Sequence, residues 1–199
     1  LLTLLSDSFF FELEGGSIMS GYESDSYHAF INAYSSANTN FVITPNKIEG
    51  IVVEIKYPCT LESASIRVTS AVAGSAIVGL YKYDVDLDTW ELVAQTDPTS
   101  PFNLGVASQQ EVSYAAPVDV EPGIYASVIL ADSAATIYSL TRPAGSTYFG
   151  FNGTIGTTSD RSYANLILTY TSILPSAPVL AVNYRSGGLA PLLLHKTIA

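Results

Sequence analysis

The chain has few residues that could cross-link it or anchor it in a bilayer. Among its 199 residues Cys59 is the only cysteine, which excludes an intramolecular disulfide and a metal site built from several cysteines. We expect the Cys59 thiol to pack as a small apolar group beside Pro58. No apolar run approaches the about 18 residues that a membrane-spanning helix needs, so we expect no membrane insertion.

Charge is scarce, and positive charge most of all. Charged residues make up 13% of the chain, against about 25% in an ordinary globular protein. The 8 Lys and Arg are outnumbered by 18 Asp and Glu, giving a net charge of −10. This balance argues against nucleic acid as the principal partner and against an anionic membrane surface. Since 48% of the residues are hydrophobic, we expect contacts between subunits to cover the excess apolar area.

Sequence motifs for catalysis are missing as well. There is no Gly-x-Ser-x-Gly elbow, no His-Glu-x-x-His and no Gly-rich phosphate loop. The two histidines, His28 and His195, lie far apart in the sequence. Asp119 and Glu121 are close to each other in the sequence, but such a pair of carboxylates does not by itself indicate a glycosidase. We therefore expect a non-enzymatic protein that uses no cofactor and no metal.

What the chain has in abundance is the pattern of short strands. Apolar and polar residues alternate from about Tyr27 onward, and β-branched and aromatic runs are separated by Gly, Pro, Asn and Asp. We predict strands at residues 29–34, 41–43, 48–57, 63–69, 75–83, 90–96, 110–114, 123–130, 136–140, 148–152 and 164–171. Strands at this spacing predict an all-β fold, specifically an antiparallel β-sandwich of jelly-roll type with extended arms at both ends.

The alternation also predicts which side chains face the core. The residues expected to share a buried face within their strands are Ala64, Ile66 and Val68, then Val78 and Leu80, then Ile124, Ala126, Val128 and Leu130. On the opposite faces we expect Ser65, Arg67 and Thr69 to meet water, and Gly79 and Tyr81 to point away from the core.

The two ends of the chain differ from its middle. Residues 1–26 are predicted to be an association arm or connector, in which Leu2, Leu5, Phe9 and Leu13 have helical spacing while the FFF run keeps a strand or extended arm open. Residues 27–172 are predicted to form the sandwich. Since the chain begins at Leu1 rather than at a methionine, we expect it to be part of a longer chain or to lack its true N-terminus.

Residues 173–199 are predicted to be a C-terminal docking tail, with a further strand at 179–184. An exposed cluster of Leu192, Leu193 and Leu194 behind Pro175 and Pro178 would lower solubility, so we expect these leucines to form an assembly interface together with the N-terminal arm. The alternative is that the tail completes the sandwich as an edge strand.

The stretch from about Phe41 to Leu140 carries a recognisable order of phrases. It runs IVVEIKYPCTLESASIRVT, then AVAGS, then VGLYKYD, then LVAQT, and later PGIY followed by ASVILAD. This order resembles a β-sandwich domain of tail fibres and other surface proteins of tailed bacteriophages. The chain departs from that pattern between Asp84 and Trp90, where family members often have a Gly-Pro turn.

The resemblance implies a structural protein on the surface of a phage particle. The role it favours is a tail-fibre or adhesin component that contacts the host surface and assembles with itself, as a trimer, and with other virion proteins. Capsid decoration or a head fibre is one alternative. A carbohydrate-binding module is the other.

Two groups of residues could bind a ligand. Asp84, Asp86 and Asp88 alternate as in a calcium loop, but Thr89 and Gln95 stand where an EF-hand needs Gly and Glu, so a solvated hairpin tip is favoured. Sugar rings stack on aromatic faces, and the candidate glycan-binding residues are Trp90, Tyr138, Tyr148, Phe149 and Tyr163, with Phe151 nearby. The alternative for these aromatics is a place in the core or in a subunit interface.

Overall fold

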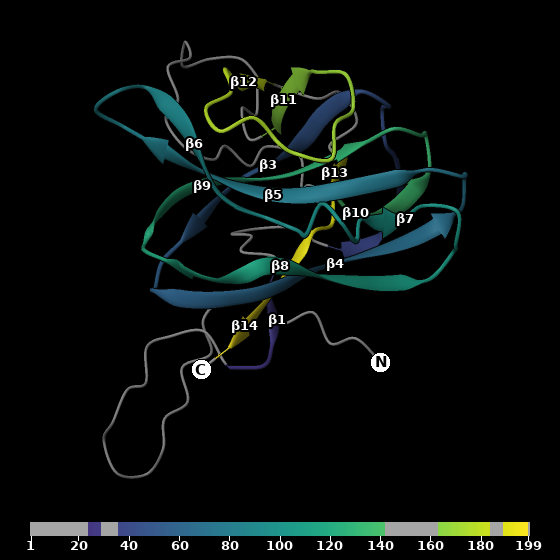
Figure 1. Cartoon of the computed structure of the whole chain (residues 1–199), viewed down its shortest axis with the longest axis horizontal. Helices are drawn as coiled ribbons and strands as arrows, with labels where there is room; N and C mark the ends of the chain where they lie inside the picture. Colours follow the sequence, from purple (N-terminus) through teal and green to yellow (C-terminus); the bar gives the residue numbers. More distant parts are fainter. Residues whose placement is uncertain (1–23, 29–35, 142–162, 184–188, 199) are drawn as a thin grey trace.

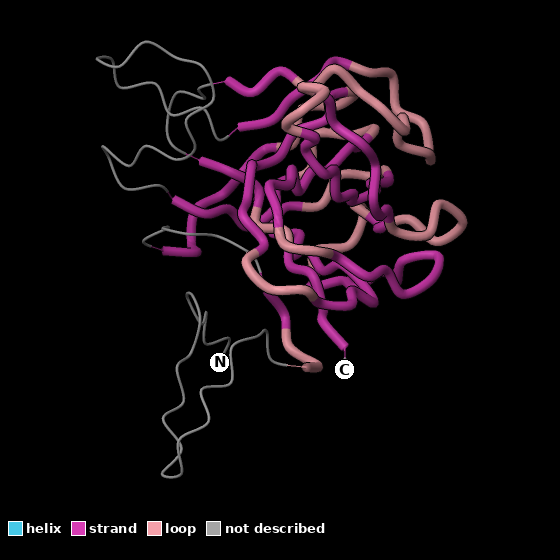
Figure 2. The backbone as a smooth tube through the Cα atoms, turned by 90° about the vertical axis from the view of Figure 1, so that its left-hand side faces the viewer, coloured by secondary structure: helices cyan, strands magenta, loops and turns pink. Residues whose placement is uncertain are grey.

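Two curled antiparallel sheets packed face to face form the domain (Figure 1). The computed structural model describes residues 24–28, 36–141, 163–183 and 189–198, and within these ranges the chain forms strands and loops (Figure 2). No helix within these ranges is long and apolar enough to span a bilayer. The prediction of an all-β fold is confirmed, and at this level so is the prediction of a sandwich.

Within the described residues each sheet contains seven strands. Sheet I contains β1 (Tyr27–His28), β2 (Ser36–Val42), β4 (Cys59–Ser70), β8 (Gln109–Val120), β10 (Thr136–Thr141), β13 (Leu189–Pro191) and β14 (Leu194–Ile198). Sheet II contains β3 (Lys47–Ile55), β5 (Ser75–Asp84), β6 (Thr89–Gln95), β7 (Phe102–Asn103), β9 (Gly123–Ala131), β11 (Tyr163–Ile167) and β12 (Ala181–Asn183).

The strand order shows that the sheets are built from distant parts of the chain. Sheet I runs β1-β14-β4-β10-β13, with β8 paired to β4 and β2 paired to β10, and sheet II runs β12-β11-β3-β9-β5-β6, with β7 paired to β5. The two sheets meet where β6 ends, because Thr96 forms a bridge with Tyr114 and the Asp97 amide donates to the Ser113 carbonyl at 2.9 Å. The C-terminal strand β14 lies inside sheet I, between β1 and β4.

Every second side chain along the strands points into the space between the two sheets. We call the buried side chains in this space the inner core. Ala64, Ile66 and Val68 of β4 and Val78 and Leu80 of β5 all belong to it, as the sequence predicts. The face of β4 expected to be wet is only partly so. Arg67 is exposed, but Ser65 is buried and its hydroxyl donates to the Gln110 carbonyl at 2.9 Å.

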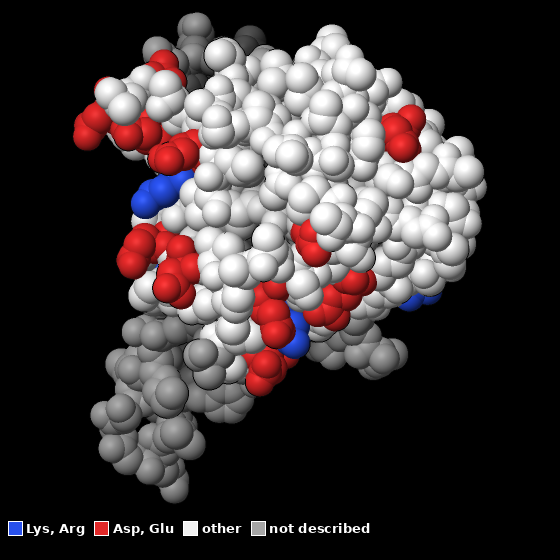
Figure 3. All heavy atoms as spheres, viewed as in Figure 1, with Lys and Arg blue, Asp and Glu red and all other residues white. Residues whose placement is uncertain are grey.

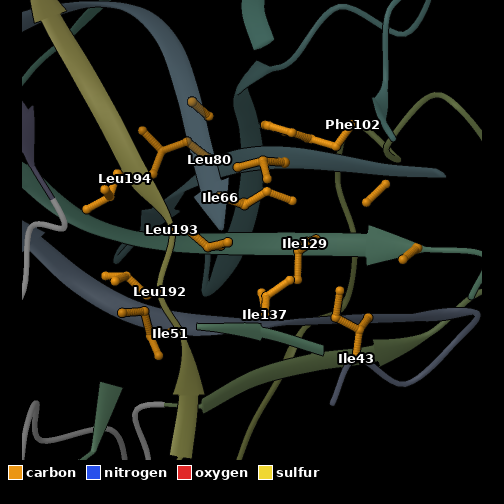
Figure 4. Close-up of a cluster of buried hydrophobic side chains, with 14 of the residues drawn as sticks. Ile43, Ile51, Ile66, Leu80, Phe102, Ile129, Ile137, Leu192, Leu193 and Leu194 are labelled. Atoms are coloured by element: carbon orange, nitrogen blue, oxygen red, sulfur yellow. The ribbon is translucent and has the colours of Figure 1, made fainter. Parts of the chain in front are cut away.

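The leucines predicted to dock on another subunit lie in this inner core. Figure 4 shows Leu192, Leu193 and Leu194 among isoleucines from both sheets, and all three are buried. The structure therefore corrects their role from an assembly interface to core packing. Residues 189–198 follow the alternative prediction, in which the tail completes the sandwich. The difference is that β14 is an interior strand and not an edge strand.

A second core lies on the opposite face of sheet II, and we call it the outer core. Residues 168–180, here called the strap, leave β11 and cross this face before reaching β12. Leu174 and Leu180 of the strap are buried against Ile77, Tyr81 and other apolar residues of sheet II. The domain therefore has three layers, which are sheet I, sheet II and the strap.

The strap explains why both faces of two strands in sheet II are apolar. Ile124, Ala126, Val128 and Leu130 share one face of β9 as predicted, but this face belongs to the outer core, while Tyr125, Ile129 and Ala131 enter the inner core. On β5 the face predicted to point away from the inner core carries Tyr81, which is fully buried under the strap. Gly79 is on this face too, and a Cβ atom there would lie 2.2 Å from Leu174 Cδ1.

Most of the predicted strands fall on observed ones. Those at 41–43, 48–57, 63–69, 75–83, 90–96, 110–114, 123–130 and 136–140 overlap β2, β3, β4, β5, β6, β8, β9 and β10. The prediction for 164–171 is too long because the strap begins at Leu168, and the one for 179–184 overlaps β12. The short strands β1, β7 and β13 were not predicted, and β14 was foreseen only in the alternative that the tail completes the sandwich as an edge strand. The predictions at 29–34 and 148–152 lie outside the described residues.

Candidate interaction surfaces

The hairpin between β5 and β6 projects the most acidic loop of the described chain. Asp84, Asp86 and Asp88 are exposed there together with Val85 and Leu87, and Figure 3 shows the red cluster at the upper left. Two of the carboxylates shape the turn. Asp84 Oδ1 accepts from the amides of Asp86 at 2.9 Å and Leu87 at 3.1 Å, and Asp88 Oδ1 accepts from the Tyr83 hydroxyl at 2.5 Å.

These contacts bear on the calcium alternative for the same loop. Within the described ranges no three His, Cys, Asp or Glu side chains are grouped so that they could hold a metal ion. Asp88 has a φ of 52°, which places the end of the turn in the left-handed region that Asp tolerates better than most residues. The loop is an exposed hairpin tip whose turn is held by Asp84 and Asp88.

The structure does not bring the predicted glycan-binding aromatics together. Trp90 is only 5% exposed and packs in the outer core with its ring centroid 5.0 Å from that of Tyr83, so its face is not available to a sugar. The prediction of a stacking platform at Trp90 is therefore wrong. The tryptophan was expected at a loop, but the strap converts its side of sheet II into a core.

The remaining aromatics are distributed over different parts of the chain. Tyr138 belongs to β10 in sheet I and is half-buried, with the Arg67 guanidinium carbon 5.1 Å from its ring centroid. Tyr163 opens β11 in sheet II. Tyr148, Phe149 and Phe151 lie outside the described residues, as do the arm residues Leu2, Leu5, Phe9 and Leu13.

At the lower end of the molecule in Figure 1, residues 24–28 are joined to β14. The Asp25 amide donates to the Thr197 carbonyl at 2.8 Å, and the Thr197 amide donates to the Ser26 carbonyl at 3.0 Å. On the outer side of sheet I the Tyr27 hydroxyl donates to Glu111 of β8. We call this region, where the two terminal strands lie side by side, the terminal pole.

Glu111 links four strands at this pole. Its carboxylate accepts from Tyr27 of β1 and, at 2.5 Å, from Ser63 of β4, and Lys196 of β14 lies near it. Partial burial alone would raise the pKa of the Glu111 carboxyl, but these hydrogen bonds and the Lys196 charge hold it below its ordinary value. For the Tyr27 hydroxyl, burial and the bond to Glu111 raise the pKa to about 12.

A polar cluster also lies within the inner core. His195 Nδ1 is 2.5 Å from the Tyr114 hydroxyl and His195 Nε2 is 2.8 Å from Ser127 Oγ, so the imidazole connects sheet I to sheet II. Burial, and to a smaller extent the neighbouring His28, lowers the pKa of His195 from 6.5 to about 4. The ring is therefore neutral at pH 7, when one nitrogen donates and the other accepts.

A serine hydroxyl paired with an imidazole can act as a nucleophile in an accessible site. Here Ser127, His195 and Tyr114 are all buried between the two sheets, so a substrate would have to separate the sheets to reach them. We therefore assign the cluster a structural role. The polar residues bond to one another, which offsets the cost of burying them.

Sequence reasoning considered His195 only as a partner for His28 and missed this cluster. A signal was present, because Ser127 interrupts the apolar strand ASVILA and His195 follows LLL. A polar residue inside an otherwise apolar strand needs a bonding partner if its side faces the core. The identity of the partners, however, depended on the placement of β14, which was foreseen as a strand only in the alternative for the tail and then at an edge of the sheet.

No family model matches the chain, and no curated protein matches it.

Proposed function

We propose that this chain is a non-enzymatic structural protein of a tailed-bacteriophage particle, most specifically a tail-fibre or adhesin component that presents its sandwich to the host surface. The proposal starts from the phrases between Phe41 and Leu140, which resemble sandwich domains of such proteins. The described part of the chain is a sandwich of two sheets, the architecture that the resemblance implies.

We also propose that the sandwich is of jelly-roll type. The chain passes from β2 in sheet I to β3 in sheet II, back to β4, and again to β5. The run β8, β9, β10 and β11 alternates between the sheets in the same manner. Repeated crossing between two sheets is typical of jelly rolls and supports this assignment.

The observation that carries the functional proposal is the terminal pole. Because residues 24–28 pair with β14, the chain enters the sandwich beside its C-terminal strand. The described end of the predicted association arm, residues 24–26, lies at this pole, while the acidic β5–β6 hairpin projects elsewhere (Figure 1). A domain attached at one end and exposed at the other suits a surface component of a particle.

Immunogold electron microscopy tests the proposal. Antibodies raised against the purified chain would be applied to phage particles from a host strain that carries its coding sequence. We expect gold on the tail fibres or the tail tip. Gold on the head instead would favour the capsid-decoration or head-fibre alternative, and particles without label, beside a positive blot of the purified chain, would overturn the virion role.

A further inference from the structure

We propose that the strap forms the contact between two copies of this chain, with the strap of one copy facing the strap of the other. The inference does not depend on the virion role. It replaces the C-terminal leucines, which lie in the core, with a different surface for self-association.

Exposed apolar side chains are the first observation. The two most exposed large apolar residues of the described chain are Val179 at 87% and Ile167 at 83%, and Ile173 follows within the same region at 64%. Each precedes a leucine on the sheet side of the backbone, so the strap turns one aliphatic residue inward and one outward in turn. Aliphatic side chains repeated on one outer layer are typical of a protein contact.

The absence of charge within this layer is the second observation. Residues 163–183 contain no Asp, Glu, Lys or Arg. The exposed residues of the strap are Thr169, Thr171, Ser172, Ile173, Ser176, Ala177 and Val179, and Ile167 precedes it at the end of β11. Figure 3 shows the upper part of the molecule as mostly white, with red carboxylates at the left and lower edges, near the centre and in one cluster at the upper right.

Charge also selects the occupant. A chain with a net charge of −10 repels its own copies wherever carboxylates face one another. Packing strap against strap removes apolar surface from water and puts no ionised side chain of residues 163–183 opposite another. Charged residues border the strap, among them Asp132, whose charge acts on Tyr170. Lys47 pairs in register with Ile167, and Glu91 precedes Leu92, whose amide donates to Ser176 at 2.8 Å.

The strap is also held firmly enough to serve as an interface. The Tyr81 hydroxyl donates to the Pro175 carbonyl at 2.9 Å, and the Leu174 amide donates to Gln95 Oε1 at 2.8 Å. At its start the Tyr170 amide donates to Asn46 Oδ1 at 2.8 Å. A surface already fixed by its own fold loses little conformational entropy when a partner binds.

Light scattering on the full chain, across a concentration series, tests the contact. The test variant is Ile173→Lys with Val179→Lys, and the matched control is Val85→Lys with Leu87→Lys, since those residues are 71% and 70% exposed on the β5–β6 hairpin. Both variants make the net charge less negative by the same amount. Weakened association in the test variant therefore cannot come from stronger overall repulsion.

We expect an even number of chains in the wild-type oligomer, in place of the trimer that the family resemblance implies, half that mass in the strap variant and an unchanged mass in the control. Thermal unfolding should be alike in the three proteins, because the buried Leu174 and Leu180 are retained. A monomeric wild type, or an equal mass for strap variant and control, would overturn the proposal. Because this assay uses no phage particle, its failure is separate from failure of the virion role.

Discussion

The two cores of this domain differ in how they are closed. The inner core is enclosed by two hydrogen-bonded sheets, and β14 lies inside one of them, between β1 and β4. The outer core is enclosed by sheet II and a strap with few regular backbone pairings, held by side-chain and single amide bonds such as Tyr81 to Pro175. Equally buried side chains in the two cores can therefore differ in how much stability is lost when they are truncated, because a loop relaxes around a cavity more easily than a sheet does.

The largest effect is expected from Leu193→Ala in the inner core. The side chain is buried among residues from both sheets, so the cavity cannot close easily, and the free energy of unfolding should fall by about 4 kcal/mol. Urea unfolding followed by circular dichroism measures the change. If Leu193 contacted another subunit instead, the loss of stability would depend on protein concentration.

The second largest effect is expected from a change of pH, which should destabilise the inner core. The unfolded His195 binds a proton near its ordinary pKa of 6.5, whereas the folded one binds it only near pH 4. The unfolded state therefore binds more protons in this window, and stability should fall by about 3 kcal/mol as the pH is lowered from 6.5 to 4.

Unfolding curves at a series of pH values check this expectation. The variant His195→Gln should lose most of the slope between pH 6.5 and 4, while His28→Gln, which removes the smaller influence on His195, should keep most of it. An unchanged slope in His195→Gln would show that other groups cause the acid sensitivity.

Substitutions in the outer core should lower stability less than those in the inner core. The effects of substitutions on the strap and on sheet II should also be coupled. We expect Leu174→Ala to cost about 2 kcal/mol, less than Leu193→Ala, because the strap can settle onto sheet II. Gly79→Ala should also destabilise, since its Cβ would meet Leu174 Cδ1 at 2.2 Å. The variant that carries both substitutions lacks that clash. Its loss in the free energy of unfolding should therefore be about 1 kcal/mol smaller than the sum of the two single losses.

The smallest effect is expected where the strap begins. Asn46 has a φ of 59°, and its side chain accepts from the Tyr170 amide. Asn46→Gly keeps the backbone conformation and removes only that bond, which should cost about 1 kcal/mol. Hydrogen exchange at the Tyr170 amide should accelerate while exchange in β9 stays slow. Equal acceleration in both would mean that the two cores open together.

The sequence was sufficient for the parts of the fold that depend on local pattern. Strands such as β4 and β5 alternate clearly, so both their positions and the inner-core residues Ile66 and Leu80 could be predicted. The sequence did not reveal which layer covers which face. Trp90 was interpreted as an exposed aromatic because nothing in its own neighbourhood indicates that residues 168–180, far along the chain, lie over it.

The C-terminal strand β14 is a second case in which the sequence did not reveal what covers an apolar segment. The leucines at 192–194 were correctly recognised as residues that must be covered, but the covering surface could lie within the domain or on a partner, and solubility alone cannot distinguish the two. Pairing of β14 with β4 joins residues more than a hundred positions apart, for example Lys196 with Ser63. No local signal records such a pairing.

The position of β14 has a consequence for the order in which the molecule is made. A ribosome synthesises β4 long before residues 194–198, yet β4 and β1 gain their shared neighbour only from that last strand. Sheet I therefore stays incomplete until residues 194–198 have emerged, well after β1 and β4. Pairing between such distant segments is slow, and until it occurs the nascent chain exposes an unpaired strand edge that favours aggregation.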